Sequence, residues 1–318
     1  MSDASAPPTS ALSVLMVASE AQPYAKTGGL ADVTGALAAA LARLGHAVTM
    51  VMPRYRVVDA AGRGGRRLPL TMGGRAFEVG LVEVPHGPRE RVVLVECDEL
   101  YDREGLYGAG GQDHPDNAVR FGVLSRAALE YAVGLESPPS IVHAHDWQTG
   151  LVPVLLRTRY SADPVWRRIP SLFTIHNLAY QGVFPAETLS ALDLGSELLS
   201  IDGLEFWNQV SFLKGGINFA DTLTTVSPAY AREIRTPEYG EGLEGLLVHR
   251  QQVLTGILNG IDTDTWNPWT DPYLPAPFSA ADLGGKRFAK RAVLTRYGLP
   301  DDATAMARPL IGMVSRLV

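Results

Sequence analysis

Residues 11–53, ALSVLMVASEAQPYAKTGGLADVTGALAAALARLGHAVTMVMP, decide the fold. Residues 11–19 form an apolar, β-branched run that predicts a buried strand. After the glycine pair at 28–29, apolar side chains recur at steps of three and four, which predicts a helix that Gly45 ends. Residues 47–53 predict a second strand, which stops at Pro53. Strand, helix and strand in this order are the repeating unit of a parallel sheet.

The same alternation returns further along the chain. Strands are predicted over 140–146, 170–177, 221–227 and 252–260, with helices over 147–160, 208–220 and 228–235. Apolar strands that alternate with helices indicate a parallel sheet covered on both faces. We therefore expect an α/β protein with a Rossmann-like, doubly wound, mostly parallel sheet.

The segment from Leu68 to Leu100 has a different pattern. Two apolar runs, 77–84 and 91–97, are separated by PHGPRE, which predicts an antiparallel hairpin inserted on the sheet. A glycine-rich loop follows, and Asp116 is expected to cap a helix that runs to about Leu135.

The alternation ends at Gly260, which suggests a domain boundary. We expect a disordered leader over 1–11, a Rossmann-like domain over 12–260 and an interdomain linker over 261–284. Residues 285–318 would begin a second, truncated nucleotide-binding domain, with a helix and then a strand in RPLIGMVSRLV. A lone parallel strand cannot pair its backbone, so we expect the chain to be a fragment.

Composition excludes several classes of protein. The net charge of −6 argues against a nucleic-acid-binding face. The single cysteine, Cys97, excludes an internal disulfide and is consistent with a cytoplasmic protein. The N-terminus has no secretory pattern, and no apolar run is long enough to cross a membrane.

The first candidate site is the KTGG loop after the first strand. Gly28 and Gly29 would let backbone N–H groups approach an anion at a helix start, and Lys26 would add a positive charge. A flexible loop with a solvated lysine is the plain alternative. The loop is neither a Walker A loop nor a G-x-G-x-x-G fingerprint, and no acidic residue ends the second strand, which disfavours an NAD-dependent oxidoreductase.

Two further strand ends carry polar side chains. His143 and His145 share one face of their strand, Asp146 stands at its tip, and His176 ends the next strand. A metal site would need more ligands than these, so we favour Asp146 and His176 as hydrogen-bonding partners of a sugar. A histidine that merely satisfies buried backbone groups remains an alternative. Among the aromatic residues only Tyr107 is expected to stack on a sugar, because burial is not forced in its glycine-rich loop.

Several motifs occur in order with compatible spacing from Leu12 to Leu317. They are SEAQPYAKTGGLADV, VHAHDWQTGL, FTIHNLAYQG, LEFWNQVSFLKGGINFAD, TVSPAYAREI, EGLEGLL, LNGIDTDTWNP and VSRL. Together they resemble the bacterial glycogen synthases and plant starch synthases that use ADP-glucose.

The resemblance implies a glycosyltransferase with two facing Rossmann-like domains. It implies transfer of glucose from ADP-glucose to the non-reducing end of an α-1,4-glucan such as glycogen, with retention at the anomeric carbon and without a metal or other cofactor. Asp146 and His176 would line the glucosyl pocket as catalytic residues. The implied substrate-binding residues are Lys26, Gly28, Gly29, Tyr107, Asn259 and Arg316.

Most of the nucleotide pocket would lie in the second domain, so we expect this chain alone to be inactive. A noncatalytic glucan-binding module is the alternative, and UDP-glucose stays possible as the donor. The oligomeric state is not predicted.

Overall fold

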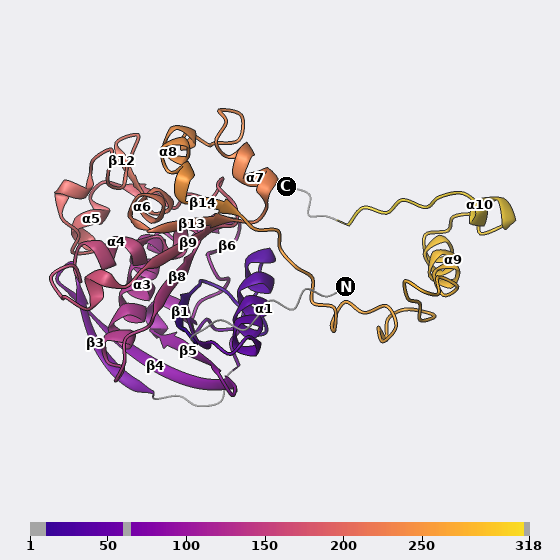
Figure 1. The fold of residues 1–318 in the computed structure, drawn as a ribbon, viewed down its shortest axis with the longest axis horizontal. Coiled ribbons are helices and arrows are strands. Elements are labelled where there is room, and N and C mark those ends of the chain that lie inside the picture. The colour runs from indigo at the N-terminus through magenta and orange to yellow at the C-terminus, as the bar shows by residue number, and fades with distance from the viewer. Residues whose placement is uncertain (1–10, 60–64, 315–318) are drawn as a thin grey trace. The chain divides into compact units, whose positions relative to one another are not determined.

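The computed structural model describes residues 11–59 and 65–314 (Figure 1). Residues 1–10 of the predicted leader and Arg316 therefore lie outside the described residues. The chain divides into two compact units, one ending at Asn259 and the other starting at Gly260. Each unit is described by itself.

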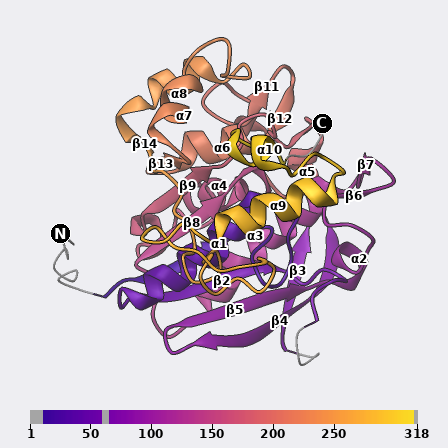
Figure 2. The same ribbon diagram turned by 90° about the vertical axis from the view of Figure 1, so that its right-hand side faces the viewer.

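A nine-stranded sheet runs through the described part of the first unit. Its strands, in spatial order, are β14 (Leu254–Gly256), β13 (Thr222–Thr225), β9 (Ser171–Ile175), β8 (Ile141–His145), β1 (Ser13–Val17), β2 (Ala47–Pro53), β5 (Glu90–Glu96), β4 (Arg75–Gly87) and β3 (Arg66–Met72). Figure 2 shows the succession from β14 through β13, β9 and β8 to β2, β5 and β4. All neighbours from β14 to β5 pair in parallel, whereas β4 and β3 are antiparallel additions. The predicted mostly parallel, doubly wound sheet is confirmed.

Helices cover both faces of this sheet. Those of the first unit are α1 (Gly29–Arg43), α2 (Asp98–Tyr101), α3 (Asn117–Val133), α4 (Leu151–Arg157), α5 (Thr188–Ala191), α6 (Phe212–Phe219), α7 (Pro228–Glu233) and α8 (Glu244–His249). The α4 helix packs against both α3 and α6, and Figure 1 shows α1 on the opposite side of the sheet. Short 3₁₀ turns cover Trp147–Thr149, Trp166–Arg168, Ser196–Leu198 and Gln251–Val253.

Two small sheets lie outside the main one. The β10 (Val183–Pro185), β12 (Gln209–Ser211) and β11 (Glu205–Phe206) strands form one, and β6 (Gly108–Ala109) with β7 (Gln112–Asp113) forms the other. Residues 209–211 were predicted as the start of a helix. They instead pair with β10 and β11, and the Ser211 hydroxyl then caps α6 by accepting from the Lys214 amide.

Some predicted elements are confirmed and others are wrong. The inserted hairpin is β4–β5, but β3 was not predicted. Asp116 precedes α3 without capping it, because its carboxylate bonds the Arg103 guanidinium at 2.7 Å instead. The strand predicted over 308–318 does not form over its described residues, since no neighbouring strand is present to pair with it.

The sheet and its covering helices enclose one continuous apolar core. Its strands are apolar on both faces, as expected of a buried parallel sheet. Val17, Val51 and Val93 are fully buried, as are Phe121 of α3 and Ile217 of α6. This core fixes the strand ends, which carry the polar residues considered next.

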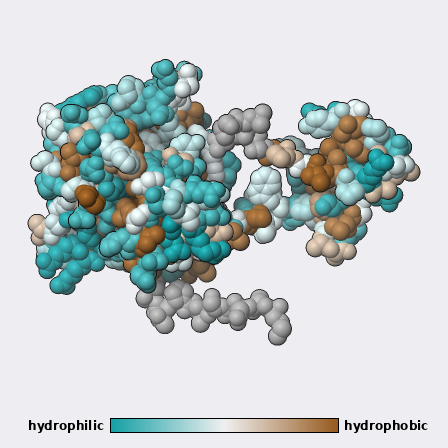
Figure 3. Space-filling model, turned by 90° about the horizontal axis from the view of Figure 1, so that it is seen from above, coloured by the Kyte–Doolittle hydropathy of each residue, from teal (hydrophilic) through white to brown (hydrophobic). Residues whose placement is uncertain are grey.

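The second unit is small, and most of its described residues are exposed. It contains α9 (Lys286–Arg296) and α10 (Ala303–Ala307), and of its described residues only Gly285 and Leu294 are buried. Its exposed large apolar side chains include Phe288, Ile311 and Met313. Figure 3 shows the molecule coloured by hydropathy, with hydrophobic residues in brown.

Candidate active site

The site lies where the winding of the sheet reverses. The β1 strand has β2 on one side and β8 on the other, so the chain leaves β1 in one direction and returns to build the sheet in the other. In doubly wound sheets, ligands bind at this switch point, outside the carboxyl ends of the strands. The loops after β1, β8 and β9 all emerge at that edge.

The loop after β1 presents an open helix N-terminus. Gly28 occupies the N-cap position in an extended conformation, and no described side chain caps α1 there. A Cβ atom at Gly29 would meet nothing within 4 Å. The backbone angles do not demand glycine here, because neither residue has a positive φ. The absence of side chains instead leaves the first N–H groups of α1 open to a ligand.

Lys26 lies beside this helix start. Its Nζ is 2.6 Å from Asp32 Oδ1, and the two side chains are 42% and 53% exposed. An ion pair this exposed contributes little to stability. Lys26 can therefore exchange Asp32 for an anionic ligand at a small cost in free energy.

Glu20 holds the loop, and sequence reasoning gave it no role. The side chain is only 3% exposed. Its carboxylate accepts a hydrogen bond from the Thr27 backbone N–H, and the Thr27 hydroxyl donates to it at 3.0 Å. The Tyr107 hydroxyl also donates to Oε1, at 2.8 Å. One buried carboxylate therefore joins the KTGG loop to the glycine-rich loop. In the sequence, the sign of such a role was an acidic residue placed directly after an apolar strand.

Tyr107, the aromatic residue expected to stack on a sugar, is packed and hydrogen-bonded rather than loose in its loop. It is partly buried, its ring centroid lies 5.9 Å from that of Phe121, and its hydroxyl is 2.8 Å from Ser19 Oγ. Burial raises the pKa of its hydroxyl well above the usual value. Tyr107 thus lies beside the loop after β1 but holds Glu20 through its hydroxyl, which limits its ring as a stacking surface.

Asp146 occupies a strained position directly after β8. Its φ of 57° and ψ of −179° fall in a region of backbone angles that is occupied almost only by glycine, so the backbone is strained here. Its Oδ1 accepts the His176 backbone N–H at 2.7 Å, so it ties the end of β8 to the end of β9. Burial raises the pKa of this carboxyl to about 7, against the opposing effect of the His176 and Asn177 amides.

The three histidines form a row. The ring centroids of His143 and His145 are 4.0 Å apart and those of His145 and His176 are 5.3 Å apart, so the shared face predicted for the first two is confirmed. Burial lowers the pKa of His143 to about 3 and that of His176 to about 4. All three rings are therefore neutral near pH 7. Within residues 11–59 and 65–314 no three acidic, histidine or cysteine side chains are arranged to hold a metal ion.

The remaining predicted residue of this unit lies apart from these contacts. Asn259 is exposed, in the segment after β14. The structure therefore brings together the KTGG loop, Tyr107, Asp146 and His176, with Glu20 as the residue that sequence reasoning missed.

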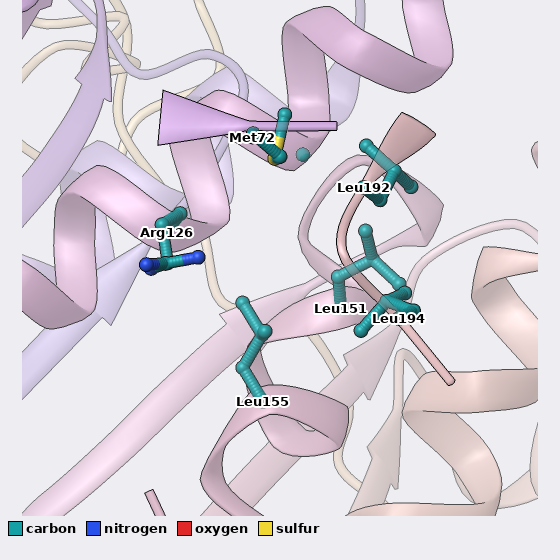
Figure 4. A pocket seen from close by; sticks show the side chains of 7 residues that line it. Met72, Arg126, Leu151, Leu155, Leu192 and Leu194 are labelled. Atoms are coloured by element: carbon teal, nitrogen blue, oxygen red, sulfur yellow. The ribbon is translucent and has the colours of Figure 1, made fainter. Parts of the chain in front are cut away.

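The small cavity in Figure 4 is separate from this edge. It measures about 10 Å³ and is lined by Met72, Gly122, Arg126, Leu151, Leu155, Leu192 and Leu194. Figure 4 shows apolar side chains of β3, α4 and the segment after α5 around it, together with Arg126 of α3. A space of this size holds about one water molecule, so it is a packing defect of the core.

Comparison with known proteins identifies the class. A sequence model described as the starch synthase catalytic domain matches residues 13–249. The chain also aligns with the solved catalytic domain of starch synthase IV from Arabidopsis thaliana, bound to ADP and acarbose, with a TM-score of 0.80 and 36% identity. That alignment covers 92% of this chain and 60% of the other. The chain therefore belongs to the starch synthase catalytic domain family.

Its curated relatives within the family are bacterial glycogen synthases. The chain is 46% identical to the glycogen synthase of Syntrophotalea carbinolica and 48% identical to that of Myxococcus xanthus, over 96% of its own length in each case. It spans 63% and 64% of the length of these two relatives. The resemblance inferred from the motifs is confirmed. No helix among the described residues is long and apolar enough to span a membrane.

Proposed function

We propose that the protein to which this chain belongs is a glycogen synthase, which transfers glucose from ADP-glucose to the non-reducing end of an α-1,4-glucan with retention of configuration. The observation that carries the proposal is the open, uncapped start of α1 with Lys26 beside it, next to Asp146 and His176 at the switch point. These are the groups that a sugar nucleotide requires.

The α1 start suits the donor's diphosphate. Helix N-terminal N–H groups and a nearby lysine favour an anion, and the charge on the diphosphate grows as the sugar leaves. Fixed donors therefore stabilise the transition state more than the ground state. From the resemblance of their motifs, Arg316 is proposed to help neutralise the diphosphate and Asn259 to be a further residue of the substrate cleft.

Asp146 and His176 suit the transferred glucose. The Asp146 carboxyl and the His176 imidazole lie at adjacent strand ends, and both are held by hydrogen bonds within the protein. Preorganised polar groups recognise sugar hydroxyls without a large cost in conformational entropy. We propose that they line the glucosyl pocket, that the reaction needs neither a metal nor another cofactor, and that it occurs in the cytoplasm.

The test is incorporation of labelled glucose into glycogen, with ADP-glucose and UDP-glucose offered separately. It is run on the 318-residue chain and on any longer product of the same reading frame. Incorporation from ADP-glucose by the longer product, undiminished by EDTA, is expected. Glycogen binding without incorporation by every product would instead indicate a noncatalytic glucan-binding module.

The Asp146→Asn variant tests whether the measured reaction depends on this site. It keeps the shape of the side chain but removes its negative charge, and we expect incorporation to fall by at least tenfold. An Asp146→Asn protein as active as the parent would show that the reaction, if present, occurs elsewhere.

A further inference from the structure

The row of histidines is anchored at its far end. The His143 Nε2 lies 2.7 Å from Thr174 Oγ1, which in turn lies 2.6 Å from Thr224 Oγ1. These side chains come from β8, β9 and β13, three adjacent strands of the sheet. The rings therefore stand on a rigid base, and their orientation is fixed by the sheet.

A single hydrogen bond joins the rings of His145 and His176. The His145 Nδ1 lies 3.0 Å from His176 Nε2, and both rings are neutral, so one nitrogen donates and the other accepts. The other ring nitrogen of His145, Nε2, is buried and has no hydrogen-bond partner among the described residues. The two possible arrangements of the proton differ in what they leave at this buried atom.

If His176 donated, His145 would carry its own proton on Nε2, as a buried N–H without an acceptor. If His145 donates from Nδ1, the buried Nε2 is a bare lone pair. Orphaned buried N–H groups are rarer in proteins than under-satisfied acceptors, which favours the second arrangement. The His176 proton then sits on Nδ1, which has no partner among the described residues, on a side chain that is partly exposed.

We propose that His145 is a positioning residue that fixes the tautomer of His176, so that His176 presents its Nδ1–H as a hydrogen-bond donor to the ligand. His145 itself touches no ligand, since it is fully buried. Its role would be to prevent the other tautomer, in which His176 would present a bare nitrogen and could only accept. A sugar hydroxyl, which both donates and accepts, would then be bound in one orientation.

The same arrangement keeps His176 neutral. A second proton on His176 would occupy Nε2, which would force the His145 proton onto its orphaned Nε2. Protonation at one ring would therefore strand a buried N–H at the next ring, in addition to burying a charge.

The test is the ¹⁵N spectrum of the histidine side chains in the 318-residue chain, in which protonated and bare ring nitrogens have well-separated chemical shifts. The chain has seven histidines, so each can be assigned by substitution. We expect His145 and His176 both to be protonated on Nδ1. A wild-type His176 protonated on Nε2 would overturn the proposal.

Two variants separate positioning from mere packing. His145→Asn keeps a donor near the position of Nδ1 and should preserve the His176 tautomer. His145→Leu removes the donor, so the His176 proton should no longer be confined to Nδ1. His143→Asn is the matched control, because it removes an imidazole from the row but not the donor to His176. An unchanged His176 tautomer in His145→Leu would refute the role of His145. If His145→Leu does not fold, the wild-type and His145→Asn spectra decide.

The kinetic consequence rests on the proposed function. In an active longer product, His145→Leu should lower kcat by about tenfold, the loss expected for one hydrogen bond, with a smaller effect on KM, and His145→Asn should recover most of it. If no product has transferase activity the proposed function fails, while the spectra still decide the tautomer.

Discussion

Glu20 is the residue whose removal should most directly loosen the loop after β1. Glu20→Gln would place an amide N–H₂ among donors that now share a carboxylate, leaving at least one buried donor unsatisfied. We expect a loss of about 1–3 kcal/mol in the free energy of unfolding, measured by urea denaturation. Glu104→Gln, at an exposed carboxylate, should leave the midpoint unchanged. Equal midpoints for the two variants would refute this role of Glu20.

Lys26 should matter for the donor but not for stability. Lys26→Ala and Asp32→Asn both remove the same exposed ion pair, so each should change the free energy of unfolding by less than about 1 kcal/mol. Only Lys26→Ala removes the cation. In an active longer product it should lower kcat/KM for ADP-glucose by roughly 10- to 150-fold, the range expected for a hydrogen bond to a charged group. Similar kinetics for both variants would exclude Lys26 as a donor contact.

For single residues, the sequence predicted well which side chains lie at the site but predicted poorly which partners they bond. Asp146 and His176 were placed at adjacent strand ends by periodicity alone, and there they lie. The role of Glu20 depends on Tyr107, far away in sequence, and that of His145 depends on a nitrogen left without a partner. Both facts follow from tertiary packing, which no local pattern encodes.

Two helical glycines allow a test of packing at the level of the element. A Cβ atom at Gly216 in α6 would lie 2.5 Å from the Phe173 ring of β9, whereas one at Gly245 in α8 would meet nothing within 4 Å. Alanine favours a helix over glycine by about 1 kcal/mol. Gly245→Ala should therefore stabilise the protein slightly. Gly216→Ala should destabilise it by about 1–3 kcal/mol, because the overpacked Phe173 is fully buried.

Thermal unfolding of the two alanine variants decides the question. Opposite shifts in Tm are expected. A stabilised Gly216→Ala protein would mean that α6 can move away from β9 to relieve the contact with Phe173.

Long buried elements were the most predictable. The strands β1, β2, β8 and β9 carry mainly apolar runs that have one interpretation in an alternating chain. Short elements were not: β12 was taken for the start of α6, since Gln209–Ser211 is too short for a periodicity, and its strand conformation comes from pairing with β10 and β11.

The stability of the whole molecule should fall as the medium becomes acidic. In an unfolded chain histidines titrate near pH 6.5, but burial lowers the pKa of His143 to about 3 and that of His176 to about 4. Below about pH 6.5 the unfolded chain therefore binds protons that the folded chain does not. Each such histidine lowers the free energy of unfolding by at most about 1.4 kcal/mol per pH unit between pH 6.5 and its folded pKa.

Asp146 acts in the opposite direction. Because burial raises the pKa of its carboxyl to about 7, the folded chain binds a proton there that the unfolded chain releases above about pH 4. The gain in the free energy of unfolding from Asp146 offsets the loss from about one histidine. Because burial lowers the pKa of His145 as well, the free energy of unfolding should still fall on acidification. Urea midpoints between about pH 4.5 and 7.5 measure it. His143→Asn should flatten the profile, and an unchanged slope would contradict the assignment.

The two units should separate under a protease. No helix or strand lies between β14 and α9, and the described residues of the second unit bury almost nothing. Cleavage is therefore expected within residues 260–285, leaving a folded product that ends near Asn259. Mass spectrometry of a timed digest locates the cut. Early cleavage inside the first unit would argue against the proposed linker.

The position of β1 in the sheet has a consequence for how the protein is made. In the finished sheet Val14 pairs with Val48 on one side and with Ile141 on the other. Val48 is synthesised soon after Val14, but Ile141 leaves the ribosome much later. At about 5–20 residues per second, the delay is on the order of ten seconds. During that time one edge of an apolar strand is open to other nascent chains. We expect the newborn chain to need a chaperone for this interval, although both edges of β1 are paired in the finished sheet.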